Sequence, residues 1–344
     1  MVSSRKQKRA IKDLTAQVDA LRVERHARDD VEVVHSLGFA LFELSSELRH
    51  KPRMTQDYRE TLNEGIEVLG ESRLDPRVTN ALGAMLARRA WLQLQIGDDR
   101  RARESAEACA ALLQDVRVTD ALDPVEAVES LVTSAKVLAR CGRHDASLEA
   151  ARLAEGFAAE ADQPADFERL SCLALLAHCS ALEAVQDHDA ARVKAQQAAR
   201  YANRAFETDA NGQNAYVTAL TQHAVATAMS NEQRPRDALP FAQSAVDWFE
   251  QSEKLGHKSY SSMNHTAALT TLMHLHLALG NQREARSYAN SAYNSLGYRV
   301  LRTSDIAELR DQAQAVVSAL LEVGKTRDAQ FVARVVNKRT GASS

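Results

Sequence analysis

The feature that most constrains this chain is a repeat in which turn-forming residues are followed by alanine. Two less regular copies begin at Asp187 and Arg234, and four begin with a glycine: Gly97, Gly142, Gly280 and Gly324. Successive anchor alanines are 44, 44, 48, 47 and 44 residues apart: Ala102, Ala146, Ala190, Ala238, Ala285 and Ala329. A nearly constant period of this length indicates one supersecondary unit repeated along the chain.

Each unit is predicted to be a helix, a short turn and a second helix. Four residues after the anchor, five of the six copies again have alanine, and Lys194 is the exception. Residues i and i+4 lie on one helix face, so two alanines there allow another helix to approach closely. A helix often ends at a position with left-handed backbone conformation, and the glycine before the anchor fits that position. Before the turn, residues such as Leu131, Ala135 and Leu138 follow helical spacing.

The composition agrees with an all-helical chain. Among its 344 residues are 59 Ala, 13 Gly and 6 Pro. Alanine is the best helix former, whereas an all-β fold needs many turn residues and many β-branched or aromatic strand residues. The sequence therefore excludes a β-sandwich or β-barrel.

The repeat resembles the tetratricopeptide repeat (TPR), which has a turn glycine, an alanine at the start of the second helix, and a small residue on the first helix. Ala90, Ala135 and Ala226 are candidates for that small residue. The usual unit has 34 residues, so this chain is a long-helix variant, and the early Trp and Pro of the family are mostly missing. The resemblance implies an all-α fold, a right-handed α-solenoid of about seven antiparallel hairpins over residues 31–340. Val31–Leu48 would pair with the segment 58–66, and hairpin boundaries are expected near Pro52, Pro76, Pro124, Pro164, Gly212, Gly256 and Arg302.

The two ends differ from the repeats. Residues 1–30 begin with a basic run that contains Lys6, Lys8 and Arg9, followed by apolar residues at 3-4-3 spacing. We interpret this segment as a solvated helix, with a short coiled coil that pairs two copies and contact with an anionic surface or nucleic acid as alternatives. Residues 341–344 are expected to be a disordered tail.

The sequence contains no recognisable catalytic or metal-binding motif. There is no HExxH, P-loop, GxSxG or GxGxxG pattern, and the four cysteines form no CxxC pair. The formal net charge of −3 favours neither nucleic acid nor membrane as a partner. The sequence shows no signal-peptide region and no apolar run near 18 residues, so we expect a cytoplasmic chain, and the Ala and Arg bias indicates a bacterial one. We also expect reduced and mostly buried thiols, no cofactor, no metal and no enzymatic activity.

A stacked array of hairpins offers a groove lined by the first helix of each pair. Lys136 and Arg140 lie four residues apart, so they could grip a carboxylate or phosphate group, and Trp91 is a candidate for either the groove or the core. We find the groove positions by counting back along each first helix from its turn. The candidates are Trp91, Lys136, Arg140, His223, Thr227, His274, Gln314 and Ser318. An irregular helix join is expected near Pro240, because proline disrupts a helix interior.

Two functions follow from this architecture. The first is a protein-interaction adaptor that binds a peptide or a partner helix in the groove. The alternative is a ligand-switched receptor, since the chain resembles in outline the bacterial peptide-sensing regulators, whose repeat domains close around a short peptide. An enzyme with an unrecognised site is the third hypothesis, and a deep pocket with convergent polar groups would favour it.

Overall fold

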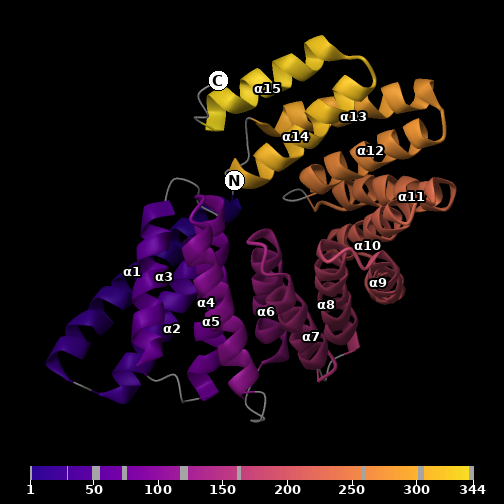
Figure 1. Ribbon diagram of the computed structural model, residues 1–344. Helices are drawn as coiled ribbons and strands as arrows, with labels where there is room; N and C mark the ends of the chain where they lie inside the picture. The colour runs from indigo at the N-terminus through magenta and orange to yellow at the C-terminus, as the bar shows by residue number, and fades with distance from the viewer. Residues whose placement is uncertain are drawn as a thin grey trace. The chain divides into compact units, whose positions relative to one another are not determined.

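The computed structural model describes residues 2–28, 30–48, 55–71, 76–116, 123–160, 164–257, 261–300 and 306–340 (Figure 1). Within these ranges the chain forms fifteen α-helices and no strand. The helices are α1 (Val2–Ala27), α2 (Val31–Leu48), α3 (Thr55–Gly70), α4 (Pro76–Gln95), α5 (Asp99–Val116), α6 (Pro124–Arg140), α7 (His144–Ala158), α8 (Pro164–Ala184), α9 (His188–Thr208), α10 (Gly212–Asn231), α11 (Pro235–Lys254), α12 (Ser261–Ala278), α13 (Gln282–Val300), α14 (Ile306–Glu322) and α15 (Thr326–Thr340).

Helix α1 is followed by seven helix pairs, α2–α3 to α14–α15, and the two helices of each pair pack against each other. The prediction of an all-α fold with about seven hairpins is therefore confirmed. The expected starts at Pro76, Pro124, Pro164 and Gly212 are the first residues of helices. Proline suits such a start because the first helical N–H has no partner within the helix. The boundaries predicted near Pro52 and Arg302 lie outside the described residues.

Six turns, from α4–α5 to α14–α15, share one backbone conformation. In four of them a glycine has a φ between 71° and 81°: Gly97, Gly142, Gly280 and Gly324. In the other two, Gln186 and Gln233 adopt φ values of 63° and 61°. Because side chains with a Cβ disfavour this left-handed region, glutamine is strained where glycine is not.

A small buried residue stands five positions after the left-handed residue in all six hairpins. These residues, each at most 1% exposed, are Ala102, Ser147, Ala191, Ala238, Ala285 and Ala329. The predicted anchors Ala146 and Ala190 are thus wrong by one residue, and both remain partly exposed. The turn conformation, rather than the identity of the side chain, determines the register.

This corrected register also removes the exception at Lys194. The residue four positions after Ala191 is Ala195, which is fully buried. At the position where a serine replaces alanine, the hydroxyl of Ser147 donates a 2.8 Å hydrogen bond to the carbonyl oxygen of Ala135 on the facing helix. The candidate small residues of the first helices, Ala90, Ala135 and Ala226, are all buried.

The predicted irregular join near Pro240 is wrong, because α11 continues through it. Pro240 is the sixth residue of α11 and its ring is exposed, so the helix loses one backbone hydrogen bond near its start. Burial of Ala242, Val246 and Phe249 on the opposite side of the helix compensates for that loss.

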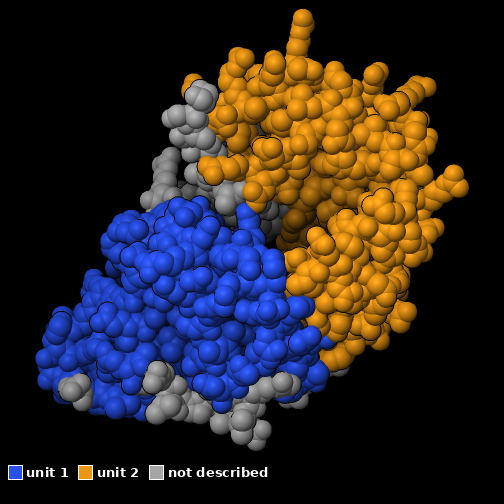
Figure 2. Space-filling view, viewed as in Figure 1, with its two compact units in different colours: residues 1–160 blue, residues 161–344 orange. Residues whose placement is uncertain are grey.

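The chain divides into two compact units, residues 1–160 and 161–344 (Figure 2). Unit 1 contains α1 to α7, and unit 2 contains α8 to α15. The sequence had suggested one array over residues 31–340. The division falls between the third and the fourth hairpin.

Helix α1 packs against α2 in unit 1. Val18, from its apolar stripe, is 1% exposed. The guanidinium of Arg22 donates from Nε to Glu64 at 2.8 Å, and that of Arg25 donates to Glu71 at 2.6 Å. These contacts attach α1 to the first hairpin, and pairing of two copies through this segment stays a prediction.

Candidate functional site

The first helices of the hairpins in unit 2 are linked by polar side chains that lie 48 residues apart. Each link joins one first helix to the next, so α8, α10, α12 and α14 lie side by side in one layer. The linked pairs are Glu183 with Asn231 at 2.5 Å, Tyr216 with Asn264 at 2.6 Å, His223 with Thr271 at 3.0 Å, and His274 with Glu322 at 3.5 Å. We call the surface of this layer the first-helix face.

Two of the predicted groove residues lie on α10 within this layer. His223 is partly buried, and its Nε2 atom lies 3.0 Å from the hydroxyl oxygen of Thr271 on α12. Burial lowers the pKa of His223 to about 4, so the imidazole is neutral at pH 7. The hydroxyl of Thr227 donates to the backbone oxygen of His223 at 2.9 Å. This pair therefore offers neutral hydrogen-bonding groups.

Three more candidates lie on α12 and α14. His274 is exposed and its Nε2 atom is 3.5 Å from a carboxylate oxygen of Glu322. Gln314 and Ser318 precede Glu322 by eight and four residues, so the three share one side of α14. Gln314 is exposed and Ser318 is partly exposed. The fold thus brings together five of the eight predicted groove residues on one face of unit 2.

The remaining three candidates belong to unit 1. Trp91 on α4 is partly exposed, and Lys136 and Arg140 are exposed on α6, which packs against α4. The four-residue spacing places both cations on one side of α6. Their recognition of a carboxylate or phosphate stays a prediction.

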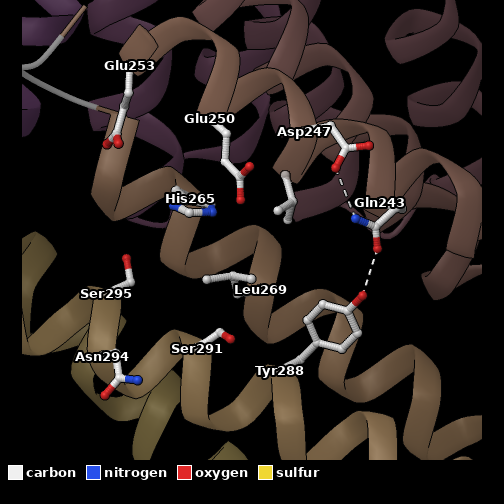
Figure 3. A pocket seen from close by; sticks show the side chains of 11 residues that line it. Gln243, Asp247, Glu250, Glu253, His265, Leu269, Tyr288, Ser291, Asn294 and Ser295 are labelled. Atoms are coloured by element: carbon white, nitrogen blue, oxygen red, sulfur yellow. Dashed lines mark hydrogen bonds between the residues drawn. The ribbon is translucent and has the colours of Figure 1, made fainter.

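Unit 2 also contains a cavity of about 610 Å³ that the sequence reading missed (Figure 3). Helices α11, α12 and α13 line it. Asp247, Glu250 and Glu253 come from α11, and His265 and Leu269 from α12. The three acids recur every third residue of α11, a pattern visible in the sequence, but nothing there indicates that α13 leaves a gap beside them.

No known protein family matches the chain, and no curated protein does. Several solved structures are similar. The apo form of RapI superposes with a TM-score of 0.54 at 11% identity, over 96% of this chain and 96% of RapI. A Rap protein complexed with competence and sporulation factor gives 0.53 at 13% identity, over 98% and 99%. NprR in complex with its cognate peptide NprX gives 0.52 at 11% identity, over 96% and 88%.

The chain has a TPR-like fold. The left-handed turn residue, the small residue five positions later and the similar solved structures all agree with it. Identities this low establish the fold and not the function.

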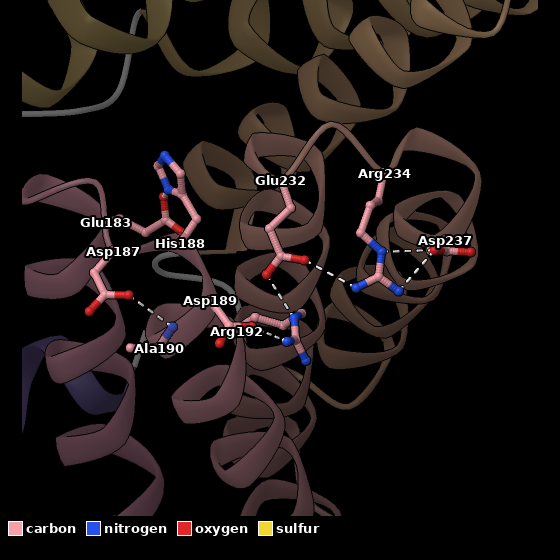
Figure 4. A network of polar contacts seen from close by, with 9 residues as sticks. All are labelled: Glu183, Asp187, His188, Asp189, Ala190, Arg192, Glu232, Arg234 and Asp237. Carbon is pink, nitrogen blue, oxygen red and sulfur yellow. Dashed lines mark hydrogen bonds and ion pairs between the residues drawn. The ribbon is translucent and has the colours of Figure 1, made fainter.

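Two adjacent TPR-like turns, those with glutamine in place of glycine, also carry a charged network (Figure 4). Glu232, beside the turn of α10–α11, accepts from Arg192 of α9 at 2.7 Å and from Arg234 at 3.1 Å. Arg192 also pairs with Asp189, and Arg234 donates to Asp237 at 2.9 Å. The network connects the α8–α9 hairpin to the α10–α11 hairpin, so its role is to hold the two hairpins together.

The described residues show few features of a reactive site. They contain no group of three or more His, Cys, Asp or Glu placed to hold a metal ion, and none of their helices is long and apolar enough to cross a membrane. The four cysteines are unpaired and three are buried, as the sequence predicted. Burial raises the pKa of the Cys109 and Cys179 thiols to about 12, which disfavours the reactive thiolate.

Proposed function

We propose that this protein is a regulatory adaptor that binds an extended peptide along the first-helix face of unit 2. The observation that supports this most is the alignment of α10, α12 and α14 by side-chain links of constant spacing. The alignment leaves a row of polar side chains on one side of the layer, among them Thr227, Gln314 and Ser318. An extended peptide has unpaired backbone N–H and C=O groups, and such a row can satisfy them.

The similar solved structures supply independent support. One Rap protein was solved with competence and sporulation factor, and NprR was solved with its cognate peptide NprX. The present chain covers 99% of the Rap protein and 88% of NprR. A peptide ligand is therefore the class of partner that we propose first.

The test begins with a random peptide library displayed on phage and panned against the full chain. An enriched peptide is then synthesised with a fluorescent label, and its Kd is measured by anisotropy. Replacing Gln314 and Ser318 with alanine should raise the Kd about tenfold, because two hydrogen bonds are worth about 1.4 kcal/mol together. The matched control replaces Ser287 and Gln330, which are exposed on second helices, with alanine.

The control should leave the Kd unchanged. Equal losses in both double variants, or an unchanged Kd in the first, would contradict binding at the first-helix face.

A peptide-switched receptor is the second candidate, and the division of the chain into two compact units favours it. A receptor of this kind should change its radius of gyration when the enriched peptide is added. An adaptor should keep the same small-angle scattering curve.

A further inference from the structure

Helix α15 has a basic face that contains an exposed aromatic ring. The helix packs against α14 (Figure 1) and buries Ala329, Val332 and Val336. Exposed residues at 4-3-4 spacing form one stripe on its other side: Arg327, Phe331, Arg334 and Lys338. We call this stripe the α15 face. Because α15 is a second helix, the α15 face is separate from the first-helix face.

The three cations of the α15 face have no acid that balances them. In other second helices an arginine pairs with an acid three or four residues away, as Arg152 does with Glu149 at 3.8 Å. No acid stands three or four residues from any cation of the α15 face. The neighbouring carboxylate of Asp328 instead pairs with Lys325 at 3.8 Å. Within the residues that the structure describes, none of the three cations forms an ion pair.

Local electrostatics do not favour this arrangement. The helix dipole disfavours a cation in the first turn, where Arg327 lies. Arg334 and Lys338 are like charges four residues apart, which destabilises an isolated helix. Phe331, between Arg327 and Arg334, is 55% exposed, the largest fraction among the exposed large hydrophobic side chains described in unit 2. The stability of α15 therefore does not account for these side chains.

We propose that the α15 face binds an acidic amphipathic helix of a partner protein. Carboxylates three or four residues apart on that helix would pair with the three cations, which extend over about 16 Å of α15. An arginine can donate two parallel N–H bonds to one carboxylate. An apolar side chain at the centre of the partner helix would cover Phe331 and remove its ring from water.

Nucleic acid fits the α15 face less well than an acidic helix. A protein that binds DNA commonly contacts about six to ten phosphates, whereas this face supplies three cations on a chain with a formal net charge of −3. A phosphate backbone also offers no apolar group for the ring of Phe331. An apolar residue with acids on either side matches both parts of the face.

The test is fluorescence anisotropy at low salt, in which the full chain is titrated into a labelled peptide with two copies of Glu-Leu-Ala-Glu-Glu-Leu-Ala. Replacing Arg327 and Arg334 with glutamate should raise the Kd at least about tenfold, because two ion pairs become repulsive. The same variant should unfold at no lower temperature than the wild type. An acid in the first turn and a glutamate four residues before Lys338 both favour the helix.

The matched control, Arg283→Glu with Arg286→Glu, reverses two exposed cations of α13 and should leave the Kd unchanged. Phe331→Ala should weaken binding with the cations intact, and a peptide with glutamine in place of glutamate should also bind more weakly. Alanine at Gln314 and Ser318, which tests the first-helix face, should not change this Kd, so the two proposals can fail separately.

Three results would overturn the proposal. The first is no binding of the acidic peptide, and the second is an equal loss of binding in the α13 control. The third is tighter binding of a single-stranded thymidine oligonucleotide, or of phosphatidylglycerol vesicles, through the same two arginines of α15.

Discussion

In unit 2, the first helix of a hairpin is exposed to solvent over a smaller part of its surface than the second helix. In α10, the exposed residues are Gln213 and Asn231, close to its two ends, because neighbouring helices cover most of its length. In α9 and α11, one whole side is exposed and carries most of the charge, as at Arg200, Glu207 and Asp247. Polar groups of the first layer pair across helices, as in His223 with Thr271 and His274 with Glu322, while charged groups of the second layer face water.

The largest effect expected from this difference concerns pH. The folded chain holds the pKa of His223 at about 4, below its ordinary value of 6.5. Between these values the unfolded chain binds a proton that the folded chain does not, so the free energy of unfolding should fall as pH decreases from about 6.5 to 4. The loss should be at most roughly 3 kcal/mol. Urea denaturation at several pH values measures it.

His223→Asn should flatten this pH dependence, whereas the same change at exposed His274 should leave it intact. Parallel curves for the wild type and His223→Asn would show that burial of this imidazole does not control stability.

A smaller effect is expected from adding volume to each layer. Ala226→Leu overfills the fully buried seam of α10 and should cost about 2 kcal/mol of unfolding free energy. Ser287→Leu adds volume to the exposed side of α13 and should change that energy by less than about 0.5 kcal/mol. Guanidinium denaturation of both variants tests the contrast, and similar losses would mean that the two layers are equally packed.

The smallest effect is expected at the turns that join the two layers. Gln233→Gly relieves a left-handed glutamine with φ of 61° and should stabilise the protein by about 1 kcal/mol. Gly280→Gln creates the same strain at φ of 79° and should destabilise it by a similar amount. Calorimetric unfolding temperatures measure both changes. A loss of stability in Gln233→Gly would indicate that the glutamine side chain itself supports the turn.

Much of the fold followed from local sequence patterns. Glycine at 97, 142, 280 and 324 marked the turns because it has no Cβ, and proline at 76 and 124 marked helix starts because it needs no N–H partner there. The same reasoning failed at Pro240, where burial of the opposite helix face outweighs one lost hydrogen bond. It also misplaced Ala146 and Ala190, because alanine is common on both sides of these helices.

Sequence periodicity was thus sufficient to establish the seven hairpins. It did not reveal which polar groups meet, because contacts such as His223 with Thr271 depend on the relative shift of two helices 48 residues apart. Nor did it reveal the cavity, since a gap between α11 and α13 depends on how closely second helices approach each other. Local conformation is encoded within a few residues, whereas distances between helices arise from the packing of the whole unit.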